Sequence, residues 1–351
     1  MLRFIFRRLG YGILVILGVI IVVFVLFFAL PGDPISVLAP PSADKATKEA
    51  IRKEFGLDKP LYMQLAYYLN DLSPLGIHEN TPQNLRNYQY IKLLSFSDKV
   101  LLLKVPYLRR SYQSQKLVSA ILLEDLYGTI ILSVVAMFFA TLVGIVLGII
   151  AALWQNTWVD YTLVTLSVLG ISMPSFVLAI LVAVIFGFYL QPYTGLSLTG
   201  SLWVDDPFTG YKLQLKNLIL PAFTLAVRPL AIIVQLTRSS MLEVLSQDYI
   251  RTAKAKGLLF RQVIYKHALK NALNPVITAV SGWFASLLAG AFFIEYIFNW
   301  KGIGKTTIDA VQALDLPVVM GATIIIAIIF IVVNILVDIL YAVIDPRIRL
   351  K

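Results

Sequence analysis

The stretch Asp248-Tyr-Ile-Arg-Thr-Ala-Lys-Ala-Lys-Gly257, followed further on by His267-Ala-Leu-Lys-Asn-Ala-Leu-Asn-Pro275, lies between two long apolar segments of the chain. Good helix formers precede Gly257, and they resume after it. The sequence therefore predicts two short helices, broken at the glycine, in a basic loop over residues 242–274. Pro275 is expected to open the next helix, because proline suits the first helical position.

The composition around this loop is that of a membrane protein. Of 351 residues, 58% are hydrophobic and 14% are charged, and the mean hydropathy is +0.80. Globular chains average about 45–50% apolar and ~25% charged residues. This composition argues against a soluble enzyme, a disordered scaffold or a free nucleic-acid binder. The chain has no cysteine, which excludes disulfides and thiol catalysis.

Membrane-crossing helices need about 20 mostly apolar residues each. Six segments meet this requirement, at residues 10–30, 126–153, 161–190, 218–241, 275–298 and 319–344. Pro174 is expected to kink the third. The pattern predicts an all-α polytopic protein with six transmembrane helices.

Charge in the short flanks predicts the orientation. Basic residues precede the first span, fill the 242–274 loop and follow the sixth span. With six spans these three segments share one side, and Lys and Arg collect on the cytoplasmic side. Both termini are therefore predicted inside. The net charge of +10 then reflects orientation in a lipid bilayer, and we expect no nucleic-acid partner.

Three segments are expected along the chain: residues 1–30, an external segment over 31–125, and a core over 126–351 with five spans. In the external segment we predict a solvated helix over 43–55 that stops at Gly56. A short amphipathic stretch over 61–69 and turns over 73–87 follow. Residues 100–105 are compatible with a strand or a helix.

Catalytic and cofactor motifs are missing. Two histidines, His78 and His267, are too few for a His-rich metal site. Asn299-Trp-Lys-Gly-Ile-Gly-Lys-Thr306 resembles a phosphate-binding loop, but Asn299 replaces the first glycine. The stretch also follows a membrane helix on the expected external side, whereas a phosphate-binding loop follows a strand in the cytoplasm. We predict no ATPase, cofactor or metal site in this chain, which also disfavours an intramembrane enzyme.

Polar residues inside the spans are the other candidates for function. Asn334, Asp338, Tyr341 and Asp345 recur at i, i+4, i+7 and i+11 on one face of the last span. Such a face must meet protein or water. We favour an internal polar clamp over a proton or ion site at Asp338. Arg228, followed by Pro229 in the fourth span, is either a structural pairing residue or a residue of the substrate path.

Glycines spaced for close helix approach occur in the second span. Gly144-x-x-x-Gly148 permits such an approach, either to another helix of this chain or to a helix of a partner subunit.

The 242–274 loop resembles the cytoplasmic loop of permease subunits in binding-protein-dependent ABC importers of the oligopeptide, dipeptide and nickel branch. Further motifs agree with this resemblance in order along the chain: Leu30-Pro-Gly-Asp-Pro34, Phe55-Gly-Leu-Asp-Lys-Pro60, Glu295-x-x-Phe298, Gly302-x-Gly304, Asp315-x-Pro317 and Asp345-Pro-Arg347. Lys301 departs from the branch, which has proline before Gly-x-Gly.

The resemblance implies a type I ABC importer permease fold (MetI-like) in the prokaryotic inner membrane. It implies a second permease subunit in a heterodimer, two cytoplasmic ATPases that use ATP, and an external solute-binding protein, with di- or oligopeptides as substrates. The residues expected to couple the loop to the ATPases are Tyr249, Arg251, Thr252, Ala253, Ala255, Lys256, Gly257 and Leu258. The alternative is a carrier or channel driven by an ion gradient through Asp338.

Overall fold

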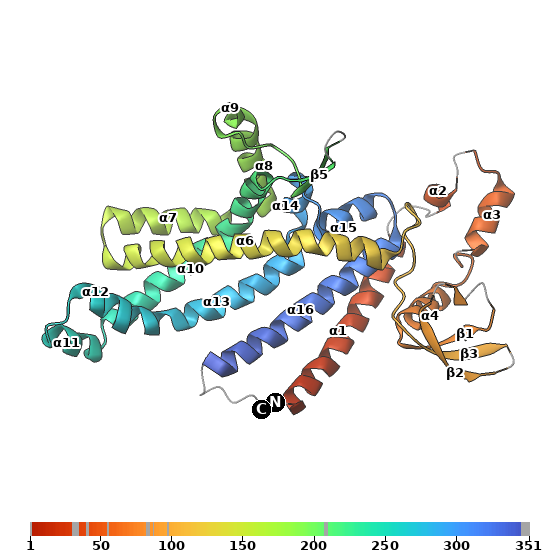
Figure 1. Cartoon of the computed structure of the whole chain (residues 1–351), viewed down its shortest axis with the longest axis horizontal. Helices are drawn as coiled ribbons and strands as arrows, with labels where there is room; N and C mark the ends of the chain where they lie inside the picture. The colour runs from red at the N-terminus through yellow and green to blue at the C-terminus, as the bar shows by residue number, and fades with distance from the viewer. Residues whose placement is uncertain are drawn as a thin grey trace. The chain divides into compact units, whose positions relative to one another are not determined.

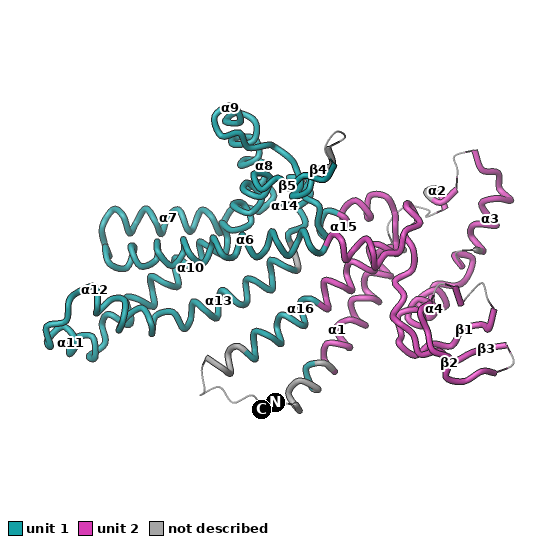
Figure 2. Tube along the Cα trace, viewed as in Figure 1, with its two compact units in different colours: residues 1–8, 126–305, 329–351 teal, residues 9–125, 306–328 magenta. Residues whose placement is uncertain are grey.

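The computed structural model describes residues 2–29, 35–39, 42–54, 56–81, 85–86, 88–96, 98–206 and 210–344 (Figure 1). Helices dominate it. The chain divides into two compact units that interleave in sequence (Figure 2). Residues 1–8, 126–305 and 329–351 form unit 1, and residues 9–125 and 306–328 form unit 2.

Four helices in the described part are long and apolar enough to cross a membrane. They are α1 (Leu2–Ala29), α6 (Val118–Leu153), α10 (Lys216–Leu245) and α16 (Leu316–Ile344). A bent pair adds a fifth candidate span. The predicted fifth span, 275–298, instead comprises two helices, α13 (Leu269–Gly290) and α14 (Phe292–Ile297). A polytopic membrane architecture is thus confirmed, while the count of six spans stays a prediction.

The third predicted span is broken rather than kinked. Helix α7 (Trp158–Ser172) ends before Met173, and α8 (Ser175–Val184) starts after Pro174, with an angle of 108° across the break. Met173 takes an extended conformation (ψ 131°), as expected because a following proline disfavours the helical region. A π-helix, η1 (Ile185–Tyr189), continues α8. The bend expected at Pro174 is present, but it is a break between two helices and not a kink within one helix over 161–190.

Pro275 lies inside α13 and does not open it. The chain is already helical through α12 (Phe260–Gln262) and the π-helix η2 (Val263–Ala268). Residues Val263, Ala268 and Ala272 are buried in one apolar cluster. We attribute the continuous helix to this burial, because it offsets the hydrogen bond that the proline ring removes.

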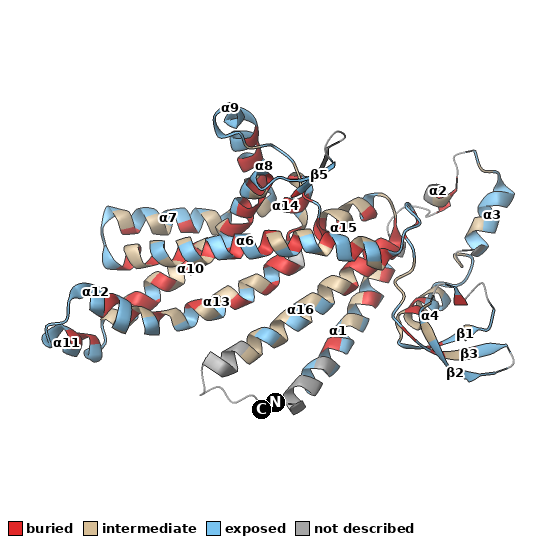
Figure 3. Cartoon of the chain, viewed as in Figure 1, coloured by how far each residue is buried: buried red, intermediate tan, exposed pale blue. Residues whose placement is uncertain are grey.

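The core of unit 1 forms around α10, which packs against α7 and α13 (Figure 1). Its buried residues include Ala226 and Ile233; buried positions are red in Figure 3. The glycines of α6 make this packing close. A Cβ atom on Gly144 would lie 2.8 Å from Cγ2 of Ile233, and one on Gly148 would lie 2.5 Å from Cβ of Thr237. The Gly-x-x-x-Gly pair thus serves a helix contact within the chain.

The part of unit 2 between α1 and α6 contains strands, which corrects the all-α expectation. Helices α2 (Ile35–Leu38), α3 (Lys45–Glu54) and α4 (Leu61–Leu72) precede an antiparallel sheet of order β1-β3-β2. Its strands are β1 (Leu75–Glu79), β2 (Tyr90–Ser95) and β3 (Lys99–Lys104). The turns expected over 73–87 thus contain a strand, whereas the helix expected over 43–55 and the stop at Gly56 are confirmed.

Short elements complete unit 1. A hairpin of β4 (Trp203–Asp206) and β5 (Gly210–Leu213) follows the short helix α9 (Gln191–Thr194). Helix α11 (Asp248–Ala255) lies in the 242–274 loop, and α15 (Ile303–Gln312) connects unit 1 to unit 2.

Candidate functional site

Gly257 ends α11 by a left-handed turn. Its φ is +73°, its N–H donates to the Lys254 carbonyl at 3.0 Å, and the Leu258 N–H donates to the Ala253 carbonyl at 3.4 Å. These two bonds form a Schellman motif, in which glycine is favoured because it pays no Cβ penalty at positive φ. A Cβ atom at this position would meet nothing within 4 Å. The glycine is therefore required by backbone conformation and faces open space.

An apolar cluster joins the two halves of the loop. Ile250 and Ala253 of α11 are buried against Val263 and Ile264 of η2. The cluster also includes Ala152 and Met241, near the ends of α6 and α10, Ala268 at the end of η2, and Ala272 in the first turn of α13. Asn271 donates from Nδ2 to the hydroxyl oxygen of Tyr249 at 2.8 Å. The loop is thus a packed elbow anchored on membrane helices.

The outer surface of the elbow is apolar and basic. Its exposed apolar residues are Tyr249 (41%), Leu258 (38%), Leu259 (69%), Phe260 (59%) and Tyr265 (63%). Seven of the eight residues predicted for coupling are exposed, and only Ala253 is buried. Sequence reasoning missed Leu259, Phe260 and Tyr265; for the first two the signal was the run of three apolar residues, 258–260, directly after the glycine turn. Exposed apolar side chains on a structured loop mark an interaction surface.

Arg228 is exposed near the middle of α10. Its hydrogen bond within the described part of the chain runs from Nη2 to the main-chain oxygen of Ile171, at 3.4 Å. That oxygen belongs to the last turn of α7, next to the break at Pro174. The partner is a neutral carbonyl, so the guanidinium charge is not matched by a carboxylate there.

Asp338 pairs with the beginning of the chain. Its Oδ2 lies 2.6 Å from Nη2 of Arg8, and both residues belong to unit 1. Asn334, one turn earlier, donates to the carbonyl of Phe330 in its own helix at 2.8 Å. The side chain of Tyr341 and all of Asp345 lie outside the described residues. An ion pair within the chain is what a clamp requires, although the role of Asp338 stays a prediction.

A second ion pair was missed by sequence reasoning. Arg238 of α10 donates from Nε and Nη2 to the two carboxylate oxygens of Asp160, at 2.5 and 2.7 Å. Asp160 lies in the first turn of α7 and its side chain is only 1% exposed. This bidentate geometry is the strong form of an Arg–carboxylate contact. The signal was an acid at a helix start and a basic residue near the end of an apolar span.

The stretch that resembles a phosphate-binding loop surrounds a carboxylate of the chain itself. Glu295 of α14 is fully buried and accepts hydrogen bonds from Thr129 Oγ1 (2.7 Å), Gly304 N (2.7 Å) and Lys305 N (3.1 Å). A Cβ atom on Gly302 would lie 2.5 Å from Oε2 of Glu295. The glycines thus make room for this side chain, and two backbone N–H groups of the stretch donate to its carboxylate.

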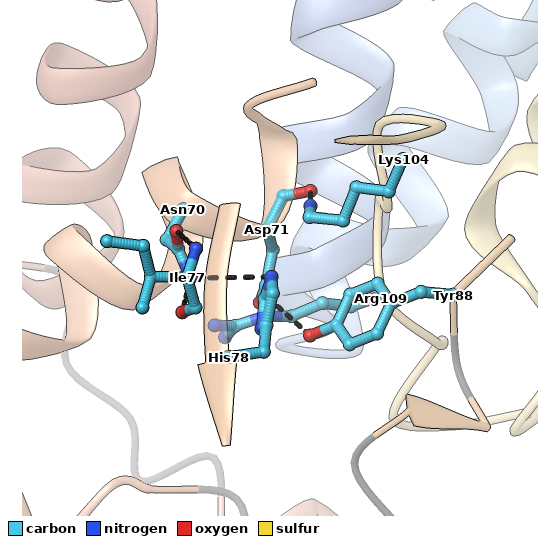
Figure 4. A network of polar contacts seen from close by, with 7 residues as sticks. All are labelled: Asn70, Asp71, Ile77, His78, Tyr88, Lys104 and Arg109. Carbon is cyan, nitrogen blue, oxygen red and sulfur yellow. Dashed lines mark hydrogen bonds and ion pairs between the residues drawn. The ribbon is translucent and has the colours of Figure 1, made fainter. Parts of the chain in front are cut away.

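Asp71 is the polar centre of the segment between α1 and α6 (Figure 4). It accepts hydrogen bonds from the Tyr88 hydroxyl at 2.7 Å and from Arg109 Nε at 2.8 Å, while Lys104 donates to its main-chain oxygen. Burial, together with the charge of Asp71, raises the pKa of Tyr88. Burial and then the charge of Lys104 lower the pKa of His78, whose ring lies 4.4 Å from that of Tyr88. These contacts join α4, the sheet and the segment before α6.

Two family models cover nearly the whole chain. The "binding-protein-dependent transport system inner membrane component" model matches residues 144–350, and the model of its N-terminal part matches residues 1–133. The chain belongs to this family. It is therefore a multi-pass inner-membrane protein, a permease component that carries no catalysis of its own. Within the described residues, no group of three or more His, Cys, Asp or Glu is placed to hold a metal ion.

Curated relatives of similar length extend the likeness. The dipeptide transport system permease protein DppB of Escherichia coli (strain K12) is 38% identical, with 100% of both chains covered. The probable D,D-dipeptide transport system permease protein DdpB of the same strain is 36% identical, covering 98% of this chain and 97% of that one. DppB of Alkalihalophilus pseudofirmus is 35% identical, covering 99% and 100%.

A solved structure supports the fold. A chain of the MetNI methionine ABC transporter, in an inward-facing conformation, matches with a TM-score of 0.50 and 15% identity. The match covers 65% of this chain and 97% of that chain. The MetI-like type I importer permease fold expected from the sequence is thereby confirmed for the core.

Proposed function

We propose that this chain is one of two permease subunits, in a heterodimer, of an ATP-driven importer of dipeptides and short oligopeptides. The other subunits are two cytoplasmic ATPases and an external solute-binding protein. The substrate class rests on the full-length similarity to proteins named for dipeptide transport. Six spans with both termini in the cytoplasm, and the segments 1–30, 31–125 and 126–351, belong to this proposal.

The observation that carries the coupling claim is the elbow over residues 242–274. A packed helix pair, fixed by the Gly257 turn, presents Leu259, Phe260 and Tyr265 to solvent among basic residues. Apolar side chains that an ordered loop exposes to water mark an interaction site, and a groove of a partner ATPase would remove these three from water. Closure of two ATPases would move both elbows and switch access from outside to inside.

ATP hydrolysis is assigned to the partners. In the stretch 299–306, the N–H groups of Gly304 and Lys305 donate to Glu295 of the chain itself, which supports placing the nucleotide site in other subunits. The ion pair between Arg8 and Asp338 supports the polar clamp over the alternative of an ion-gradient carrier, because the carboxylate is already engaged by a basic residue of the same chain.

Transport by the reconstituted complex tests the proposal. Both permeases and both ATPases are placed in proteoliposomes, and the solute-binding protein is added with labelled alanyl-alanine on the external side. We expect uptake only with ATP on the ATPase side, and none with a non-hydrolysable analogue. Uptake driven by an imposed proton gradient without ATP would overturn the proposal in favour of an ion-driven carrier.

A further inference from the structure

Arg228 lies at the middle of a membrane helix. Helix α10 runs from Lys216 to Leu245, so Arg228 follows its start by 12 residues, which is roughly 18 Å along the axis at about 1.5 Å per residue. A charged side chain at this depth is costly when it faces lipid, and such residues mark substrate paths or paired sites.

The two arginines of α10 differ in their partners. Arg238 has a bidentate carboxylate, Asp160, whereas Arg228 has in the described part only the neutral carbonyl of Ile171, at 3.4 Å. A guanidinium has five N–H donors in a planar fork. The pairing of Arg228 that sequence reasoning left open is therefore not supplied by the described residues of this chain, and most of its hydrogen-bonding capacity is available to a bound group.

Gln235 and Ser239 lie on the same face of α10 as Arg228, at i+7 and i+11, and neither of them is buried. Ile232, at i+4, is the apolar residue of this face, and it is half-buried. Helix α13, which packs against α10, also leaves a small and polar set exposed at four-residue spacing: Asn274, Thr278, Gly282 and Ser286. Polar faces of this kind occur where membrane helices line water or meet protein.

We propose that Arg228 binds the C-terminal carboxylate of a peptide during its passage, along the polar face of α10. This inference rests on the proposed function and deepens it. A planar guanidinium matches a carboxylate through two parallel hydrogen bonds, and it discriminates a free peptide terminus from a neutral one. The competing occupant is an acidic side chain of the second permease subunit.

The test compares two probes in the reconstituted complex, alanyl-alanine and alanyl-alanine amide, at concentrations of each that saturate the solute-binding protein. For the wild type we expect uptake to favour the free carboxylate. Arg228→Gln should reduce the ratio of free to amidated uptake at least about tenfold, toward unity. Arg228→Lys should retain part of the preference, because it keeps the charge but loses the planar fork. Lys48→Gln, on the exposed helix α3, is the control for loss of one positive charge.

Each other result has a meaning. A ratio unchanged in both Arg228 variants would overturn the inference, as would a parallel fall in uptake of both probes. Loss of the second permease from purified Arg228→Gln complexes, seen by gel filtration, would assign the arginine to an intersubunit pair instead. If the wild-type complex imports neither probe with ATP, the proposed function fails first, and this result is distinct from an unchanged ratio.

Discussion

Arg8 and Asp338 join the first and the last helix of the chain, with 2.6 Å between Nη2 and Oδ2. The carboxylate side chain is 25% exposed and the arginine side chain 46% exposed, so the pair is only partly shielded from its surroundings. It links two segments of unit 1 that are 330 positions apart in sequence.

Asp338→Asn should therefore lower stability modestly, by about 1 kcal/mol, a size typical of polar contacts between membrane helices. A double-mutant cycle with Arg8→Gln, followed by thermal unfolding in detergent, measures the coupling between the two side chains. ATP-driven uptake should persist without any dependence on a proton gradient. If a well-folded Asp338→Asn complex instead loses uptake completely, or if wild-type uptake responds to the proton gradient, the clamp interpretation is wrong.

The ion pair between Asp160 and Arg238 should contribute more to stability. Removing one partner of a buried pair costs about 3–5 kcal/mol, and the 25% exposure of the Arg238 side chain reduces this to about 2 kcal/mol for Asp160→Asn. Thermal unfolding of the purified chain checks the value. The matched control is Asp248→Asn, whose pair with Arg251 is exposed on both sides (94% and 75%) and should matter by under about 0.5 kcal/mol. Equal effects of the two substitutions would contradict this account.

The sheet of β1, β3 and β2 should lose stability in mild acid. The pKa of His78 is lowered in the folded chain by burial and by Lys104, while Asp71 opposes this shift. The unfolded chain therefore binds more protons as pH falls below about 6.5, and the free energy of unfolding decreases until pH passes the folded pKa. Hydrogen exchange of β1 and β3 in the full chain measures this. His78→Gln should flatten the dependence and His267→Gln should not; identical pH profiles for wild type and His78→Gln would refute the claim.

Single cysteines test the membrane topology without background, because the chain contains none of its own. Leu259→Cys (69% exposed) and Tyr211→Cys (76% exposed) replace accessible side chains in the 242–274 loop and in β5. An impermeant maleimide should label Tyr211→Cys in cells whose outer membrane or wall admits the reagent. It should label Leu259→Cys only after the inner membrane is permeabilised. Bound ATPases should then protect Leu259→Cys. Labelling of both positions from one side would rule out the six-span arrangement.

The sequence was a good guide where one physical signal dominates. Long apolar runs predicted α1, α6 and α16 well, and the glycine turn at Gly257 was recognised because glycine is favoured where a helix ends in a left-handed turn. Contacts between distant segments carried no such signal. Nothing near Arg8 indicates its pairing with Asp338, and Gly302 gave no sign that its missing side chain accommodates Glu295. The strand β1 was missed because five residues with Gly and His among them show little β pattern.

The effect of each proline was only partly predicted: a bend at Pro174 was expected, but its size and the continuous helix at Pro275 were not. At Pro174 the preceding residue turned extended and the helix ended, whereas at Pro275 and Pro229 burial of the helix face kept the helix continuous. Composition alone does not separate these cases, because the difference lies in what packs against each turn.

The central claim is that the elbow turns ATP hydrolysis into import, and Gly257 tests it most directly. Gly257→Asn tolerates the left-handed conformation and adds a side chain to the open surface, whereas Gly257→Ala adds strain of about 1 kcal/mol and little bulk. The measurement is the number of alanyl-alanine molecules imported per ATP hydrolysed in proteoliposomes. The account predicts a clear fall of this ratio in Gly257→Asn complexes that still assemble, and a smaller fall in Gly257→Ala. An unchanged ratio in both assembled variants would contradict it.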